Sequence, residues 1–309
     1  MNMLKKTICL TALALGMTGM VLAAEPAPAP DAKPVQEKAE EKAPSPADVL
    51  SAPALELASA IGNMAADESG MQTIDVNGKF PLVGNALIHN IIYSRKNPMQ
   101  AKSVMTVTVD GNRSAESYAY AEKSKDGKDL IVYIEDNRNG KEQWIKKTIP
   151  MSIYQRAGDA GSAALDNIMK NIKSVRKDYK NDYAVEFDVS GVYKAGDEKK
   201  WDALSPEQKE TVAAVLSALA KQGSITATVS IDKKSNRITK MALPLTDTIR
   251  NAGNAFLDTM KGDEGTKLLM KGLLSQSELD MAIAFDALPK DTDFTIPEKV
   301  RKEAVEEKK

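Results

Sequence analysis

Residues 104–149 read VMTVTVDGNRSAESYAYAEKSKDGKDLIVYIEDNRNGKEQWIKKTI. β-rich runs alternate here with three dipeptides, Asp110-Gly111, Asp126-Gly127 and Asn139-Gly140. Such dipeptides are the strongest short-range signal of a β-hairpin, because a type I′ turn needs positive φ at both of its central residues. The segment therefore predicts an antiparallel meander with strands over residues 104–109, 114–121, 130–134 and 143–149.

Further along the chain, three segments alternate apolar with largely polar residues, over 183–189, 225–231 and 279–285. This period of two predicts half-buried strands, each with one apolar and one solvated face. The sole histidine, His89, lies in a strand-like apolar run over 86–92, where a structural hydrogen bond is its predicted role. The predicted apolar positions of the three segments are Tyr183, Val185, Phe187, Val189, Ile225, Ala227, Val229, Ile231, Leu279, Met281, Ile283 and Phe285.

Helical signals lie between and before these strands. An apolar stripe over 45–63 predicts a helix that opens the folded domain, and a second stripe predicts a helix over 163–179. Ser205-Pro206-Glu207-Gln208 supplies an N-cap, a proline at the first helical position and a capping-box glutamine, and Gly223 ends that helix. The apolar segment 246–275 is broken by four glycines, so it predicts a movable pair of helices that covers an apolar cavity as a lid.

The first 24 residues have the pattern of a secretory signal peptide. Lys5 and Lys6 precede an apolar run over 7–22, and small residues follow before a polar break. The only cysteine, Cys9, lies inside this signal and not after it, so the mature chain is predicted to be exported, soluble, not lipidated and free of disulfides. If the signal were kept, it would act as a weak anchor. Residues 25–46, rich in Ala, Pro, Glu and Lys, predict a solvated tether, followed by a folded domain over 47–304 and a charged tail over 305–309.

Composition narrows the function. The 42 Lys and Arg residues nearly balance the 43 Asp and Glu residues, which argues against a nucleic-acid partner or an anionic membrane bound by bulk charge. The chain has no nucleophile elbow, phosphate loop or dinucleotide fingerprint, and one histidine excludes metal clusters built on histidine. Ser174-x-x-Lys177 and Ser230-x-x-Lys233 match the catalytic Ser-x-x-Lys pattern, but we attribute both matches to chance in a lysine-rich chain. We therefore predict a protein that is not an enzyme, with no cofactor, no metal and no membrane span after signal cleavage.

Several motifs together resemble a known family. The hairpin 114–136 precedes Trp144-Ile145-Lys146, and Tyr183-x-Val185-x-Phe187-Asp188-x-Ser190-Gly191 lies further on. Ile231-Asp232-Lys233-Lys234-Ser235-Asn236-Arg237-Ile238 and Ile296-Pro297-Glu298-Lys299-Val300 complete the set. Over residues 71–304 these motifs are similar to the LolA-like or LppX-like superfamily of envelope lipoproteins, nearest to bacterial members of uncharacterised function.

The resemblance implies an α+β fold, in which a curved antiparallel β-sheet forms an open half-barrel with helices packed on its concave face. Characterised relatives carry lipid, or the acyl chains of lipoproteins, in that cavity. Similar bacterial chains usually carry a lipidated cysteine after the signal, which this chain lacks, although a periplasmic carrier form lacks it too. The insertion 246–275 also looks longer than the family needs.

These observations predict a binding protein whose ligand is an acyl chain, a lipid or a lipoprotein, held between sheet and helices. The alternative is an envelope scaffold or protein-interaction module with a filled core, no small ligand and an envelope protein as its partner. The predicted cavity residues on the strands are Val185, Phe187, Val229, Ile231, Met281, Ile283 and Phe285, and those on the covering helices are Phe256, Leu257, Met260, Leu269 and Leu273.

Overall fold

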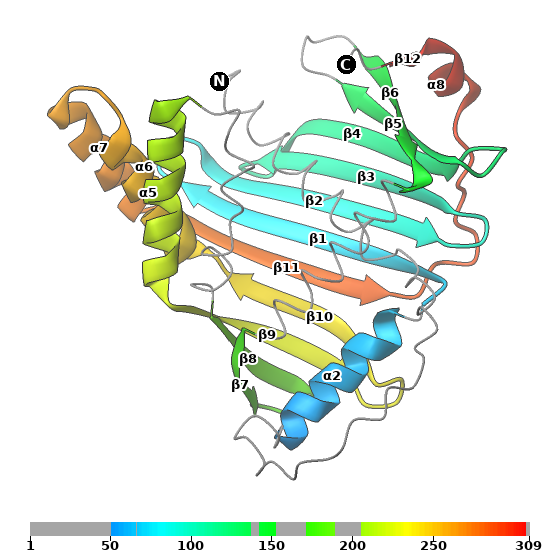
Figure 1. Cartoon of the computed structure of the whole chain (residues 1–309), viewed down its shortest axis with the longest axis horizontal. Coiled ribbons are helices and arrows are strands. Elements are labelled where there is room, and N and C mark those ends of the chain that lie inside the picture. The colour runs from blue at the N-terminus through cyan, green and yellow to red at the C-terminus, as the bar shows by residue number, and fades with distance from the viewer. Residues whose placement is uncertain (1–50, 66, 137–141, 153–170, 189–204, 307–309) are drawn as a thin grey trace, which may run out of the picture.

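The computed structural model describes residues 51–65, 67–136, 142–152, 171–188 and 205–306 (Figure 1). The predicted signal (1–24), the tether (25–46), the turn Asn139-Gly140, the motif residues Ser190-Gly191 and the last three residues of the predicted tail lie outside the described residues. Every described range contributes a helix or a strand to the fold.

One open sheet of 12 strands dominates the fold, and with a few helices it makes an α+β protein (Figure 1). The strands follow each other across the sheet in the order β12-β6-β5-β4-β3-β2-β1-β11-β10-β9-β8-β7. Neighbours pair antiparallel, except that β12 pairs with β6 in parallel. Their bounds are β1 Ser69–Phe80, β2 Gly84–Arg95, β3 Gln100–Val109, β4 Asn112–Lys123, β5 Asp129–Asp136, β6 Gln143–Pro150, β7 Ile172–Lys177, β8 Asp182–Asp188, β9 Ser224–Asp232, β10 Arg237–Pro244, β11 Glu278–Asp286 and β12 Val305–Glu306.

The predicted meander is confirmed as β3 to β6, each strand pairing with the next. At the first turn Asp110 has φ of 48° and Gly111 has φ of 77°, so both central residues adopt the positive φ that the type I′ turn requires. At the second turn Gly127 also has a positive φ of 76°. These local signals therefore set the register of this half of the sheet.

The chain builds the sheet in two halves that meet at its centre. Strands β1 to β6 run outward toward one edge, where β12 is later added beside β6. The chain then starts again at the opposite edge with β7 and returns through β8, β9 and β10 to β11. β11 pairs with β1 over nine residue pairs, from Met71 opposite Asp286 to Lys79 opposite Glu278. The sheet is continuous because the last long strand of the chain pairs with the first.

The helix predicted over 163–179 is wrong for the part that the structure describes. Residues Ile172–Lys177 form the edge strand β7, which pairs with β8 so that Val175 lies opposite Val185. The residues Ile172 and Val175 that suggested a helical stripe instead pack against the core. Pairing with β8 therefore decides the conformation of this segment, and residues 163–170 lie outside the described residues.

The helices lie at three places around the sheet (Figure 1). α2 (Ala52–Ala65) crosses one face, over the end of the sheet that contains β7 to β10. α5 (Pro206–Gln222), α6 (Thr246–Thr259) and α7 (Glu264–Ser275) gather at one end of the strands, where α6 packs against α5 and α7. α8 (Glu298–Glu303) lies beside β6. The two predicted insertions thus become α5 and the pair α6 and α7, and the capping box of α5 is confirmed at Ser205 and Gln208.

A second core lies on the face opposite to α2. Tyr120 and Trp144, with ring centroids 5.8 Å apart, pack with Tyr133 under Ile296 and Val300 of the C-terminal segment. The register places Tyr120 opposite Tyr133, on the other side of the sheet from Ala121 and Val132. The C-terminal segment therefore covers this outer face, and β12 ends it by pairing with β6.

Candidate functional site

One face of the sheet carries most of the predicted strand residues. In the centre, Val229 lies opposite Met241, Met241 opposite Ile283, and Ile283 opposite Ile74. Directly paired residues point to the same side of a sheet, so these four side chains share one face. We call this surface the apolar face; from β8 to β3 it carries Tyr183, Val185, Phe187, Ile225, Ala227, Val229, Ile231, Met241, Leu243, Met281, Ile283, Phe285, Ile74, Val76, Ile88, Ile92, Met105 and Val107.

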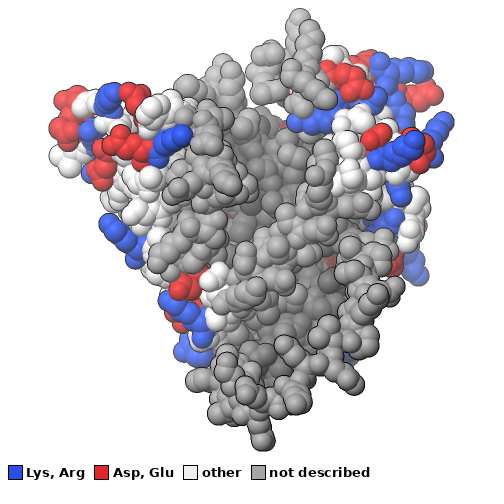
Figure 2. Space-filling model, viewed as in Figure 1, with Lys and Arg blue, Asp and Glu red and all other residues white. Residues whose placement is uncertain are grey.

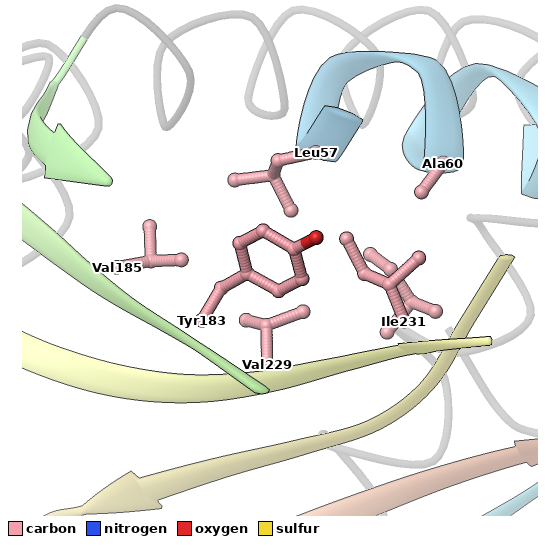
Figure 3. Close-up of a cluster of buried hydrophobic side chains, with 7 residues drawn as sticks. Leu57, Ala60, Tyr183, Val185, Val229 and Ile231 are labelled. Atoms are coloured by element: carbon pink, nitrogen blue, oxygen red, sulfur yellow. The ribbon is translucent and has the colours of Figure 1, made fainter. Parts of the chain in front are cut away.

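Helix α2 covers one end of the apolar face. Leu57 and Ala60 point from α2 onto Tyr183, Val185, Val229 and Ile231 of the sheet (Figure 3). These side chains are buried, and Phe187 and Phe285 pack against the same cluster while keeping some exposure. Most of the predicted strand residues, Phe187 and Phe285 among them, therefore belong to a well-packed core at this end of the sheet. The sequence did not predict that α2 is the helix that packs on them.

Polar contacts hold α2 in place along its edge. The hydroxyl of Tyr183 donates a hydrogen bond to the Glu56 carboxylate, and Lys177 Nζ lies 3.4 Å from the same carboxylate. This hydrogen bond lowers the pKa of Glu56 below its ordinary value, whereas burial and the Glu56 contact raise the pKa of Tyr183. Three residues further along α2, Ser59 Oγ accepts a hydrogen bond from Asn236 Nδ2 over 2.8 Å. α2 is thus attached by both apolar packing and hydrogen bonds.

The five predicted helix residues lie elsewhere. Leu257 of α6 is buried, but none of the five belongs to the buried cluster around Val185. α6 reaches the sheet at β11, at the end of the strands, and α7 packs against α6 (Figure 1). The structure therefore does not bring these residues onto the α2 end of the apolar face, and their role as a lid stays a prediction. Besides Leu257, the predicted helix residues are Phe256, Met260, Leu269 and Leu273, and the first three of these are exposed.

The α6 and α7 pair instead presents an exposed apolar surface. In α7, Leu268 is 73% exposed and Leu269 is 63% exposed, and Met270 beside them is also exposed. Lys and Asp or Glu lie close together here, as in the pairs Lys271 with Asp258 (2.5 Å) and Lys267 with Glu264 (2.8 Å). Figure 2 shows both signs of charge interspersed at this end of the molecule. The surface is therefore apolar with a mixed-charge border.

His89 makes a hydrogen bond of the kind that the sequence predicted. Its Nδ1 lies 2.6 Å from Asp75 Oδ1, and the two residues are directly opposite each other on β2 and β1. The register puts this pair on the face opposite to Ile74 and Ile88. His89 therefore does not contribute to the apolar face.

Metal and membrane signals are absent from the described ranges. Within residues 51–65, 67–136, 142–152, 171–188 and 205–306, no group of three or more His, Cys, Asp or Glu is arranged to hold a metal ion. In the same ranges, no helix has both the length and the apolar character that a membrane crossing needs.

Several residues of the apolar face were not predicted as site residues. Ile74, Ile88, Ile92, Met105 and Val107 continue the face beyond β11, through β1, β2 and β3. The alternation of Val104 to Val109 was visible in the sequence, but which of its faces joins Val229 and Ile283 depends on the pairing of β11 with β1. Leu57 and Ala60 of α2 were not predicted as site residues either, because their contacts are with strands that are distant in the sequence.

No model of a known protein family matches this chain, and no curated protein matches it. The geometry of the apolar face is therefore the basis on which a function is argued.

Proposed function

We propose that this chain is an exported, non-enzymatic protein that binds an apolar ligand, an acyl chain or a lipid, on the apolar face of its sheet. The observation that carries the proposal is the extent of that face, which runs from β8 to β3, while α2 packs against the strands at one end. An acyl chain gains about 0.8 kcal/mol for each methylene removed from water. A surface of this kind can therefore hold a hydrocarbon without special chemistry.

The proposal includes the LolA-like interpretation of the fold, in which the sheet is an open half-barrel and its concave face receives the ligand. Its support is an open, largely antiparallel sheet with a helix on its apolar side. Two of the motifs that resemble this family also pack together, because Ile296 and Val300 lie in one buried cluster with Trp144. Export is inferred from the sequence of residues 1–24 alone.

Two variants of the same strand test the proposal. Ile88 and Ile91 are both partly buried on β2, but Ile88 lies on the apolar face opposite Val76 and Ile91 lies on the other face opposite Thr73. We expect Ile88→Asn to weaken binding of a fluorescent fatty-acid analogue by about tenfold, which corresponds to about 1.4 kcal/mol. Ile91→Asn should leave the affinity unchanged. Equal affinities of all three proteins for the probe would contradict the proposal.

The exposed apolar surface of α7 favours a second candidate function, an envelope protein-interaction module. Exposed groups of large apolar side chains commonly mark contact sites, and Leu268 and Leu269 lie next to each other here. The partner would be an envelope protein with an apolar surface. In this case the double change Leu268→Gln and Leu269→Gln should abolish co-purification of that partner, whereas Ile88→Asn should not affect it.

A further inference from the structure

Helices α5 and α6 line a groove between two points where their side chains meet. At one point Thr211 Oγ1 lies 3.1 Å from Thr259 Oγ1, and at the other Gln222 Nε2 donates a hydrogen bond to Thr248 Oγ1 over 3.1 Å. The two helices are therefore antiparallel neighbours. The groove between these points has a volume of about 550 Å³, which is within the range of small-molecule sites. Its lining includes Ser217, Ala218 and Lys221 of α5 and Asn251, Asn254 and Asp258 of α6.

Two amide oxygens in the wall of this groove have no hydrogen-bond partner. Gln222 Oε1 and Asn254 Oδ1 are both buried, and neither accepts a hydrogen bond from the residues that the structure describes. In the described part of the chain these are the only two buried side-chain oxygen or nitrogen atoms without a partner, and both residues line the groove. A buried acceptor without a donor is unfavourable. The groove therefore suits a ligand that brings hydrogen-bond donors with it.

Turning the Gln222 amide over does not satisfy it. Its Nε2 group is already bonded to Thr248, so an exchange of nitrogen and oxygen would leave a donor without a partner in place of an acceptor. A hydroxyl group both donates and accepts, so it can bond to the amide in either orientation. Gln222 and Asn254 are only partly buried as whole residues, and the terminal torsions of such side chains rotate broadly, so their amides can turn toward a ligand in the groove.

The charges along the groove favour a neutral ligand. Its lining includes one acidic and one basic side chain, Asp258 and Lys221. Asp258 Oδ1 accepts a hydrogen bond from Lys271 Nζ over 2.5 Å, so its charge is already balanced. A ligand ammonium group would then lie beside amide oxygens without a carboxylate of its own, which is more costly than a hydroxyl group at the same place.

We propose that the groove between α5 and α6 binds a neutral polyhydroxyl compound, such as a sugar, through the amides of Gln222 and Asn254. One hydroxyl of the ligand would donate to Asn254 Oδ1 and another to Gln222 Oε1. This site goes beyond the proposed function, because its residues lie on helices and none of them belongs to the apolar face of the sheet.

The experiment follows the side-chain amide NMR signals of Gln222 and Asn254 in the full-length protein during titration with glucose and, separately, with n-butylammonium. Glucose should shift both signals, and n-butylammonium should shift them less. Asn254→Leu, which replaces the amide by an apolar group of similar shape, should weaken glucose binding by about tenfold, the effect of one hydrogen bond. The same variant should melt at a higher temperature than the wild type, because it removes a buried acceptor without a partner.

Asn77→Leu is the matched control, the same change at an exposed position of β1, and it should leave glucose binding unchanged. If glucose shifts neither amide signal of the wild type, water alone fills the groove and the proposal is wrong. Glucose binding that Asn254→Leu leaves intact, or that Asn77→Leu weakens, would place the sugar elsewhere and also overturn it. Tighter binding of n-butylammonium than of glucose would contradict the neutral ligand. Should Asn254→Leu fail to fold, Gln222→Met tests the other amide, with the same loss of glucose affinity expected.

Discussion

The hydroxyl of Tyr183 donates a hydrogen bond to the carboxylate of Glu56, across 127 positions of the sequence. This bond joins α2 to β8, beside the packed contacts of Leu57. It gives the attachment of α2 a defined pH dependence, because both partners titrate. The packing of helix α2 over this end of the apolar face should therefore depend on pH.

The acid side of this dependence comes from Glu56. Its pKa lies below 4.5 in the folded protein, chiefly because Tyr183 donates to it. A depressed pKa adds stability that is present above pH 4.5 and is lost as the pH falls through the folded value. In urea unfolding, the stability difference between wild type and Glu56→Gln should therefore shrink below pH 4.5. In a Tyr183→Phe background the difference should already be smaller at neutral pH; an equal difference at all pH values and in both backgrounds would refute this assignment.

The alkaline side comes from Tyr183. Burial, and then the bond to Glu56, raise its pKa above 10.0. A raised pKa adds stability that is present below pH 10.0 and is lost as the pH rises through the folded value. Tyr183→Phe should therefore unfold with a weaker pH dependence above pH 10.0 than the wild type does. A steeper dependence in the variant would be the opposite of this expectation.

Two leucines of α2 differ in what they contact. Leu57 is 3% exposed against β8 and β9, whereas Leu55, two positions earlier, is 54% exposed. Leu57→Ala should lower the free energy of unfolding by about 2–5 kcal/mol, since it leaves a cavity in the packed cluster. Leu55→Ala should change it by less than about 0.5 kcal/mol. Chemical denaturation of the two variants measures both values, and similar losses would mean that α2 does not pack as described.

Two glycines of the α6 and α7 pair should respond differently to alanine. A Cβ at Gly272 of α7 would meet no atom within 4 Å, so Gly272→Ala should stabilise the protein by about 0.5–1 kcal/mol through helix propensity. A Cβ at Gly253 of α6 would lie 2.5 Å from Leu274 Cδ2, so Leu274 would have to move. Gly253→Ala should therefore gain less than Gly272→Ala, or lose stability. Thermal melting of both variants gives the comparison, and a larger gain for Gly253→Ala would show that the two helices are not in close contact.

Local sequence signals predicted the elements that depend on local chemistry. The dipeptide Asp110-Gly111 set the β3–β4 hairpin, because its two residues can adopt positive φ. Ser205 and Gln208 set the start of α5 through their reciprocal hydrogen bonds. The alternation in β8, β9 and β11 also predicted which side chains share a face within each strand.

Elements that depend on a distant partner were missed or wrongly predicted. β1 was not predicted, because Gly70 and Gly78 weaken its strand pattern, yet Gly78 leaves the space that the Phe80 ring occupies. β10 was not predicted either. The edge strand β7 takes its conformation from β8, and its sequence alone favoured a helix.

The candidate site was predicted in part for the same reason. Val185, Val229 and Ile283 were predicted to face the same way, and the register places them on one face. What covers that face could not be read from the sequence, because an amphipathic stripe shows which side of a helix is buried but not against which partner. The stripe of α2 was visible, whereas its position over Tyr183 and Val229 depends on the whole sheet.

If the apolar face holds a hydrocarbon ligand, the folded protein purified from its own cells should carry that ligand, and mass spectrometry of an organic extract detects it. We expect acyl-chain lipids in an amount stoichiometric with the protein, and a smaller amount from Ile88→Asn than from Ile91→Asn. A folded protein that carries no lipid, and takes none up from added lipid, would show that the apolar face is not a ligand site.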